Sequence, residues 1–98
     1  MNTINIKLLD IVTGTSTNAE GLILFENISK HLQKGDLIKL SLRDLTPMSS
    51  SFLNSSFGEL IHHFGYAKIK TSIVLTDYRM SDALRIKNYL IEVSEMHV

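Results

Sequence analysis

The chain has 98 residues, of which 44% are hydrophobic and 20% charged, proportions typical of a single globular domain over residues 1–98. Its formal net charge of zero argues against a nucleic-acid or anionic-membrane surface, and its lack of cysteine excludes disulfides and thiolate metal sites. Since we find no signal segment at the start and no apolar run near the roughly 20 residues that span a bilayer, we expect a cytoplasmic protein.

The first strand is predicted at residues 4–8, where isoleucine and leucine alternate with polar residues, and residues 9–12 are expected to extend it. A helix should begin near Asn18, because Thr17 and Glu20 have the spacing of a capping box. The chain therefore opens with a strand followed by a helix.

This first helix is expected to turn an apolar face toward the sheet and to end at Gly35. The apolar face is formed by Leu22, Phe25, Ile28 and Leu32. Gly21 falls on the same face, where a glycine costs about 1 kcal/mol relative to alanine. Close packing of the helix against the sheet would offset that cost.

The second strand, at residues 37–42, has one apolar and one polar face. Its alternating side chains are Ile38, Leu40 and Leu42 on one face and Lys39, Ser41 and Arg43 on the other. A strand covered by helices on both faces would be apolar throughout, so we expect helices mainly on one face of the sheet. The turn that follows contains Pro47, which forces Thr46 into an extended conformation.

A serine-rich stretch, Pro47 to Gly58, leads into a second helix predicted from about Ser50 to Phe64, with Gly65 at its end. The core face of this helix is formed by Leu53, Phe57, Leu60, Ile61 and Phe64. The opposite face is a narrow stripe of small or polar residues, namely Ser51, Ser55, Gly58 and His62. Phe52 lies off both faces, near the helix entrance.

The third strand is predicted at Ile69 and residues 73–75, and a last helix should begin at Asp82 with Ser81 as its cap. The inward face of that helix is formed by Ala83, Ile86, Leu90 and Val93, with Tyr89 beside them. Leu84 and Ile91 point the other way, where they are either buried under a chain end or available to a partner. The order is β-α-β-α-β-α, a small α/β fold with a largely parallel or mixed sheet.

The serine cluster has two physical interpretations. Serine hydroxyls cap helices by accepting bonds from the first backbone N–H groups, which makes Ser49 or Ser50 the expected cap. Those N–H groups and the helix dipole also favour negative charge, so Ser50 and Ser51 are candidate phosphoacceptors or anion-binding residues. Both interpretations stay open at this point.

The sequence indicates no enzyme and no metal site. It lacks a glycine-rich phosphate loop, a G-x-S-x-G elbow and a cysteine nucleophile. His62 and His63 are adjacent and therefore point about 100° apart on a helix, a poor geometry for a metal. The acids near strand ends are interpreted as solvated or capping residues: Asp10, Asp36, Asp44 and Asp77. We therefore expect no catalytic residue, no metal and no cofactor.

The residues around the serine cluster form a motif, Leu45-Thr46-Pro47-Met48-Ser49-Ser50-Ser51-Phe52-Leu53-Asn54, followed by Phe57-Gly58-Glu59-Leu60. With the earlier Thr17-Asn18-Ala19-Glu20-Gly21, this motif resembles the bacterial STAS-like domain family of unknown function. The resemblance covers roughly residues 4–95. That family is similar to the STAS domains of anti-sigma-factor antagonists, which implies a small α/β domain with helices largely on one face.

The resemblance also implies partner switching, in which a serine kinase of the histidine-kinase-like ATPase superfamily binds the domain and phosphorylates a serine at the start of its second helix. The antagonist motif reads Met-Asp-Ser-Ser-Gly. Here Met48 takes the Met place, Ser49 the Asp place, Ser50 and Ser51 the serine places, and Phe52 the Gly place. The resemblance therefore implies Ser51 as the phosphoacceptor.

We predict a non-enzymatic regulatory interaction module that binds a histidine-kinase-like ATPase or an anti-sigma-like partner and is switched by serine phosphorylation. The predicted interface is formed by Ser51, Phe52, Ser55, Gly58 and His62. The alternative is a sensor that binds a small anion or a nucleotide at the N-terminus of the second helix. A homodimer through Leu84 and Ile91 is a further expectation.

Overall fold

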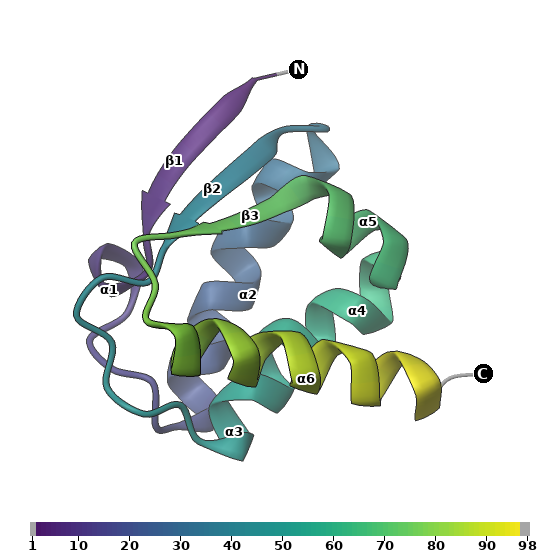
Figure 1. The fold of residues 1–98 in the computed structure, drawn as a ribbon. Helices are drawn as coiled ribbons and strands as arrows, with labels where there is room; N and C mark the ends of the chain where they lie inside the picture. Colours follow the sequence, from purple (N-terminus) through teal and green to yellow (C-terminus); the bar gives the residue numbers. More distant parts are fainter. Residues whose placement is uncertain (1, 97–98) are drawn as a thin grey trace.

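The computed structural model describes residues 2–96, which contain one sheet of three parallel strands (Figure 1). The strands are β1 (Thr3–Lys7), β2 (Leu37–Ser41) and β3 (Ile73–Thr76), and they lie in the order β1-β2-β3. The connections from β1 to β2 and from β2 to β3 each lead to the next strand in the same direction across the sheet. Because parallel crossovers share one hand, the helices of both connections lie on the same face. The predicted small α/β fold with a parallel sheet is confirmed.

The two faces of the sheet differ, as the alternation along the second strand predicted. On the covered face, the register places Ile38 between Ile4 and Ile73, and Ile38 is fully buried. On the other face, Lys39 and its neighbour Val74 are exposed. The helices therefore pack mainly on one face, and the apolar core lies between that face and the helices.

The chain after β1 departs from the prediction, because residues 8–11 form a short helix, α1 (Leu8–Ile11), and do not extend the strand. The pairing of β1 with β2 ends at Lys7 opposite Ser41, where β2 itself ends. A longer β1 would leave its backbone groups without partners. The helical turn instead buries Leu8 completely.

The helix α2 (Asn18–Gln33) begins at the predicted residue and has the predicted capping box, in which Thr17 and Glu20 each bond the backbone of the other. Gly35 follows the helix with φ +79°, a left-handed conformation that suits glycine. Both ends of this helix are therefore confirmed.

The inward face of α2 is rotated relative to the prediction. Ile28 and Leu32 are buried as predicted, but Leu22 is 46% exposed and the buried position is taken by Leu24. Phe25 is half-buried and packs against the core, so the prediction is confirmed for it. The helix is rotated because it packs against the second helix as well as the sheet.

The second helix runs without a break from Ser50 to Phe64 but contains one π-helical turn. Its three segments are α3 (Ser50–Leu53), η1 (Asn54–Gly58) and α4 (Glu59–Phe64). Two serine hydroxyls of η1 donate to carbonyl oxygens of α3, from Ser55 to Ser51 at 3.0 Å and from Ser56 to Phe52 at 2.7 Å. Such side-chain bonds compete with the backbone ladder of an α-helix and accompany the π turn.

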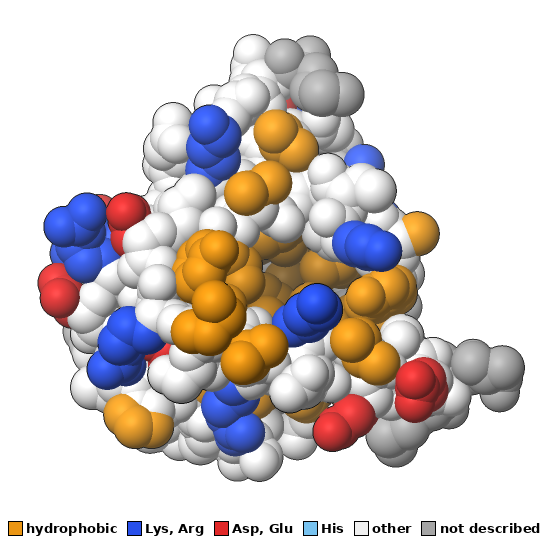
Figure 2. All heavy atoms as spheres, viewed as in Figure 1, with side chains coloured by type: hydrophobic (Ala, Val, Ile, Leu, Met, Phe, Trp, Pro, Cys, Tyr) orange, Lys and Arg blue, Asp and Glu red, His pale blue; other side chains and the backbone are white. Residues whose placement is uncertain are grey.

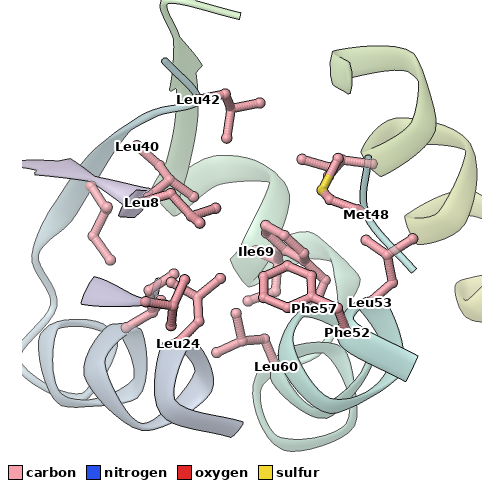
Figure 3. Close-up of a cluster of buried hydrophobic side chains, with 14 of the residues drawn as sticks. Leu8, Leu24, Leu40, Leu42, Met48, Phe52, Leu53, Phe57, Leu60 and Ile69 are labelled. Atoms are coloured by element: carbon pink, nitrogen blue, oxygen red, sulfur yellow. The ribbon is translucent and has the colours of Figure 1, made fainter. Parts of the chain in front are cut away.

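The core side of the second helix is confirmed, since Leu53, Phe57, Leu60 and Ile61 are buried and Phe64 is half-buried. Figure 3 shows Phe52, Phe57 and Leu60 beside Ile69, with Leu24 of α2 on the other side of the cluster. These side chains join both long helices to the covered face of the sheet.

The predicted start of the third strand is instead a helix, α5 (Tyr66–Ser72), which follows α4 after Gly65 with φ +85°. Ile69 is therefore buried on a helix and not in a strand. Apolar side chains recur here at helical intervals, three positions from Tyr66 to Ile69 and four from Ile69 to Ile73. This pattern explains why the segment is a helix and not a strand. The strand itself begins at Ile73, as predicted.

The last helix, α6 (Met80–Met96), begins two residues before the predicted start and packs across the second helix (Figure 1). Ile86 is fully buried, while the other predicted inward residues, Ala83, Tyr89, Leu90 and Val93, are half-buried. Among residues 2–96, no helix has both the length and the apolar character needed to cross a membrane.

Candidate functional site

Ser49 is the residue that caps the second helix. Its Oγ accepts a hydrogen bond from the Phe52 backbone N–H at 3.0 Å and donates one to the Ser16 carbonyl oxygen at 2.9 Å. Its own backbone N–H donates to the Thr15 carbonyl oxygen at 3.0 Å. Ser49 thus satisfies a first-turn donor and also ties the start of the helix to the loop before α2.

Ser50 and Ser51 form the first turn of the same helix, and both are exposed. Because Ser49 supplies the cap, neither of them is needed for that role. The two interpretations therefore apply to different residues. Capping belongs to Ser49, while Ser50 and Ser51 lie at the surface, where a modifying enzyme or a partner has access to them.

The loop at residues 42–49, which leads into these serines, is anchored by side chains from distant parts of the chain. Thr15 is fully buried, and its hydroxyl donates to the Thr46 carbonyl oxygen at 3.0 Å. Arg79 donates from Nη2 to the Leu45 carbonyl oxygen at 2.6 Å. These bonds fix the backbone of the loop and so fix the position of the serine cluster.

Arg85, on α6, places a positive charge in the same cleft as Ser50. Its Nε donates to the Met48 carbonyl oxygen at 2.9 Å. With Ser50 it also lines a cleft of about 730 Å³ between the second helix and α6, whose lining includes the acidic Glu92 as well. An anionic group on Ser50 would be stabilised both by the positive end of the helix dipole and by this guanidinium.

Two residues of the predicted interface are buried, and the prediction is wrong for both. Phe52 is 0% exposed and lies in the core (Figure 3). Ser55 is 8% exposed and faces α2, where a Cβ on Gly21 would overlap both the Ser55 Oγ and the Phe52 carbonyl oxygen. The small residues of the stripe therefore serve close packing of two helices within the molecule. Gly21 packs against the second helix and not against the sheet.

Gly58 of the predicted interface is also used for packing, because a Cβ there would lie 2.5 Å from the Tyr89 Oη. The Tyr89 hydroxyl donates to the Asn54 Oδ1 at 2.6 Å. Burial of the ring, together with the negative charge of Glu59, raises the pKa of Tyr89 above its ordinary value. α6 thus covers this part of the stripe.

Only Ser51 and His62 of the predicted interface are exposed. The ring of His62 meets that of His63 edge-on, with centroids 5.4 Å apart, and the His63 Nε2 lies 3.4 Å from a Glu59 carboxylate oxygen. Within residues 2–96, histidines and acids form no group of three or more that could hold a metal ion.

The acids near strand ends mostly make pairs with neighbouring side chains. Asp36, Asp44 and Asp77 pair with His31, Lys7 and Arg43, with nitrogen-to-oxygen distances of 3.3, 4.0 and 3.4 Å. Asp10 is exposed, but Asp36 is buried, so the interpretation as a solvated residue is wrong for Asp36. Asp44 and Asp77 have φ of 63° and 51°, a conformation that aspartate adopts more readily than most residues.

The two residues predicted for self-association differ in exposure. Leu84 is 46% exposed and lines the cleft that contains Ser50, whereas Ile91 is half-buried. Self-association through α6 stays a prediction.

The sequence did not reveal Arg79 and Arg85 as residues of this site. Each binds a carbonyl oxygen more than 30 positions earlier in the chain, and no local spacing encodes such a contact. The π turn was missed as well. The adjacent pair Ser55-Ser56 was its only signal, because serines inside a helix tend to bond the carbonyl one turn earlier.

A family model described as a STAS-like domain of unknown function matches residues 20–82, more than half of the chain. The matched region contains the whole serine cluster and the anchored loop before it. No curated protein and no solved structure matches the chain.

Proposed function

We propose that this chain, which belongs to the family of STAS-like domains of unknown function, is a non-enzymatic regulatory module that binds another protein through the start of its second helix. The proposed partner is a histidine-kinase-like ATPase or an anti-sigma-like protein, and the proposed switch is phosphorylation of Ser50 or Ser51. One observation carries the proposal. Ser49 makes the cap, and the two hydroxyls that follow it are exposed.

A phosphate on Ser50 or Ser51 would add about −1.5 to −2 charges to the first turn of the helix. The helix dipole would stabilise that charge at either serine, and Arg85 would add to this at Ser50, with which it shares a cleft, whereas a partner without a matching cation would be repelled. Neither serine belongs to the cap or the core, so the modification would change the docking surface and leave the fold intact.

The anchored loop supports the same proposal. Thr15, Arg79 and Arg85 hold backbone carbonyls of the loop before binding takes place, and preorganisation of this kind lowers the entropic cost of association. We further propose a cytoplasmic location, where ATP is available to an ATPase partner.

The test is mass spectrometry of the protein produced together with its native neighbours. We expect a phosphate on the peptide that carries Ser49 to Ser51. It should persist in Ser49→Ala and disappear in the double variant Ser50→Ala/Ser51→Ala. Consistent absence of a phosphate from this peptide would contradict the proposed switch.

The second candidate function is a sensor that binds a small anion or a nucleotide at the same helix start. The position of Arg85 in the cleft with Ser50 favours it. A thermal-shift screen with nucleotides distinguishes the two functions, since a ligand at 100 times its Kd adds about 2.7 kcal/mol to the stability of the folded state. Stabilisation by a nucleotide that Ser50→Glu abolishes would favour the sensor.

A further inference from the structure

The sheet ends at β3, and no strand within residues 2–96 pairs with its outer edge. The sequence of β3, Ile-Val-Leu-Thr, contains neither a charged residue nor a proline. Proteins commonly use charges and prolines to keep an exposed edge from pairing with other chains. At the other edge of the sheet, β1 ends with Lys7. The edge of β3 is therefore an unprotected template for another strand.

An apolar groove of about 350 Å³ lies beside that edge, between β3, α5 and α6. Phe57, Ile69 and Ile86 form its buried base, and Leu75 and Leu90 are among the side chains of its walls. Figure 2 shows this face of the molecule, with a hollow lined by apolar side chains and basic side chains around it. We call this feature the β3 groove.

The β3 groove continues the rows of side chains on the covered face of the sheet. The register places Ile38 beside Ile73 and Leu40 beside Leu75, and both β3 residues line the groove. A fourth strand next to β3 would extend these rows by one position and direct every second side chain into the groove. The groove therefore lies where the inward side chains of an added strand would point, and its lining is apolar, as those side chains require.

The charges around the groove indicate which strand would fit. Its charged lining residues are Lys70 and Lys87, both exposed, and none of the described residues that line it is acidic. Acidic residues on an added strand would be complementary to these lysines. A second copy of this chain, paired through its own β3, would bring the same two lysines and meet repulsion.

We propose that the edge of β3 and the β3 groove form a docking site for an extended segment of a partner protein. The segment alternates aliphatic with polar residues and carries acidic residues at its ends. It adds to β3 through main-chain hydrogen bonds and buries its aliphatic side chains in the groove. The β3 groove shares no lining residue with the cleft of Ser50, so this site does not depend on the proposed phosphorylation switch.

The experiment uses the full chain and a panel of fluorescently labelled peptides of about eight residues, a common strand length. In these peptides, valine, isoleucine or leucine alternates with threonine, and glutamate stands at both ends. We expect saturable binding by fluorescence anisotropy. Matched peptides with lysine at both ends should bind about tenfold more weakly. N-methylation of alternate backbone nitrogens should abolish binding, because it removes the hydrogen bonds to β3.

The double variant Lys70→Glu/Lys87→Glu should reverse the preference, so that the lysine-ended peptides bind about tenfold more tightly than the glutamate-ended ones. Both positions are exposed, and an unchanged thermal midpoint confirms that the variant is folded. Lys68→Glu is the control, since Lys68 is exposed on α5, the helix of Lys70, but does not line the groove.

Three results would overturn the proposal. The first is no saturable binding by any glutamate-ended peptide, and the second is equal binding of both peptide series or of the N-methylated peptides. The third is protection of the β3 amides from hydrogen exchange that rises with protein concentration, because a second copy would then occupy the edge.

Discussion

Ser49, Ser50 and Ser51 are neighbours in the chain, but their contacts differ. Ser49 bonds the helix it precedes and the loop before α2, whereas the other two are exposed. We expect Ser49→Ala to lower the free energy of unfolding by about 1 kcal/mol, as loss of a cap commonly does. Ser50→Ala and Ser51→Ala should each change it by less than about 0.5 kcal/mol. Urea denaturation measures all three, and equal losses would contradict the assignment of the cap.

Glu20 offers a pH test at the capping box of α2. The hydrogen bond from the Thr17 hydroxyl, together with bonds from the backbone N–H groups of Ser16 and Thr17, lowers the pKa of the Glu20 carboxyl. The folded state therefore favours the carboxylate. Its stabilising effect is present above the unfolded pKa of Glu20 and is lost as the pH falls through the folded pKa.

An NMR titration should therefore show the pKa of Glu20 below its ordinary value, and Thr17→Ala should raise it toward that value. If Thr17→Ala left the titration of Glu20 unchanged, the Thr17 hydroxyl would not be the cause of the shift.

The contact between α2 and the second helix depends on Gly21. Alanine is the better helix former by about 1 kcal/mol, yet its Cβ would overlap the Phe52 carbonyl oxygen and the Ser55 Oγ. A carbonyl oxygen of a packed helix cannot move aside alone. We expect Gly21→Ala to lower the free energy of unfolding by about 1–3 kcal/mol, the usual cost of overpacking.

Gly58→Ala is the matched control on the second helix, because at short distance its Cβ would meet only the Tyr89 Oη, a side-chain atom that one substitution removes. In a Tyr89→Phe background, Gly58→Ala should become neutral or stabilising in thermal unfolding. Ser55→Ala should not rescue Gly21→Ala in the same way, since the Phe52 carbonyl oxygen stays in place. Stabilisation by Gly21→Ala alone would show that the helices are not in close contact there.

Elements set by local patterns could be predicted from the sequence, and elements set by tertiary contacts could not. Period-two alternation located β2, and the Thr17–Glu20 spacing located the start of α2. The end of β1 depends on where its partner strand stops, which the residues of β1 do not encode. The helix α5 was missed because Ile69 fits both a strand and a helix when its neighbours are not placed.

For the molecule as a whole, the order of elements was sufficient to predict a parallel sheet. It was not sufficient to predict which residues lie at the surface. A stripe of small residues allows close approach of a partner protein or of a helix in the same chain. Ser55 and Gly58 serve the second purpose, toward α2 and α6. The sequence pattern is the same in both cases, so only the arrangement of helices distinguishes them.

The oligomeric state tests the expected contact through α6. A homodimer through Leu84 and Ile91 would give, by light scattering, twice the 11.1 kDa mass of the chain. In that case Leu84→Glu should return the mass to 11.1 kDa, because Leu84 is the more exposed of the two. A wild-type mass of 11.1 kDa would contradict a homodimer through Leu84 and Ile91.

We propose the start of the second helix, at Ser50 and Ser51, as the docking surface for a regulatory partner. Its most direct test is a calorimetric titration of the purified chain with the histidine-kinase-like ATPase domains of its own organism. Ser51→Glu carries a negative charge into the first turn, where the helix tolerates it, and Ala67→Glu adds the same charge at an exposed position of α5.

We predict that at least one such ATPase domain binds the wild-type chain, that Ser51→Glu abolishes the binding, and that Ala67→Glu leaves it unchanged. Failure of every such domain to bind, or equal binding by Ser51→Glu and Ala67→Glu, would contradict the claim.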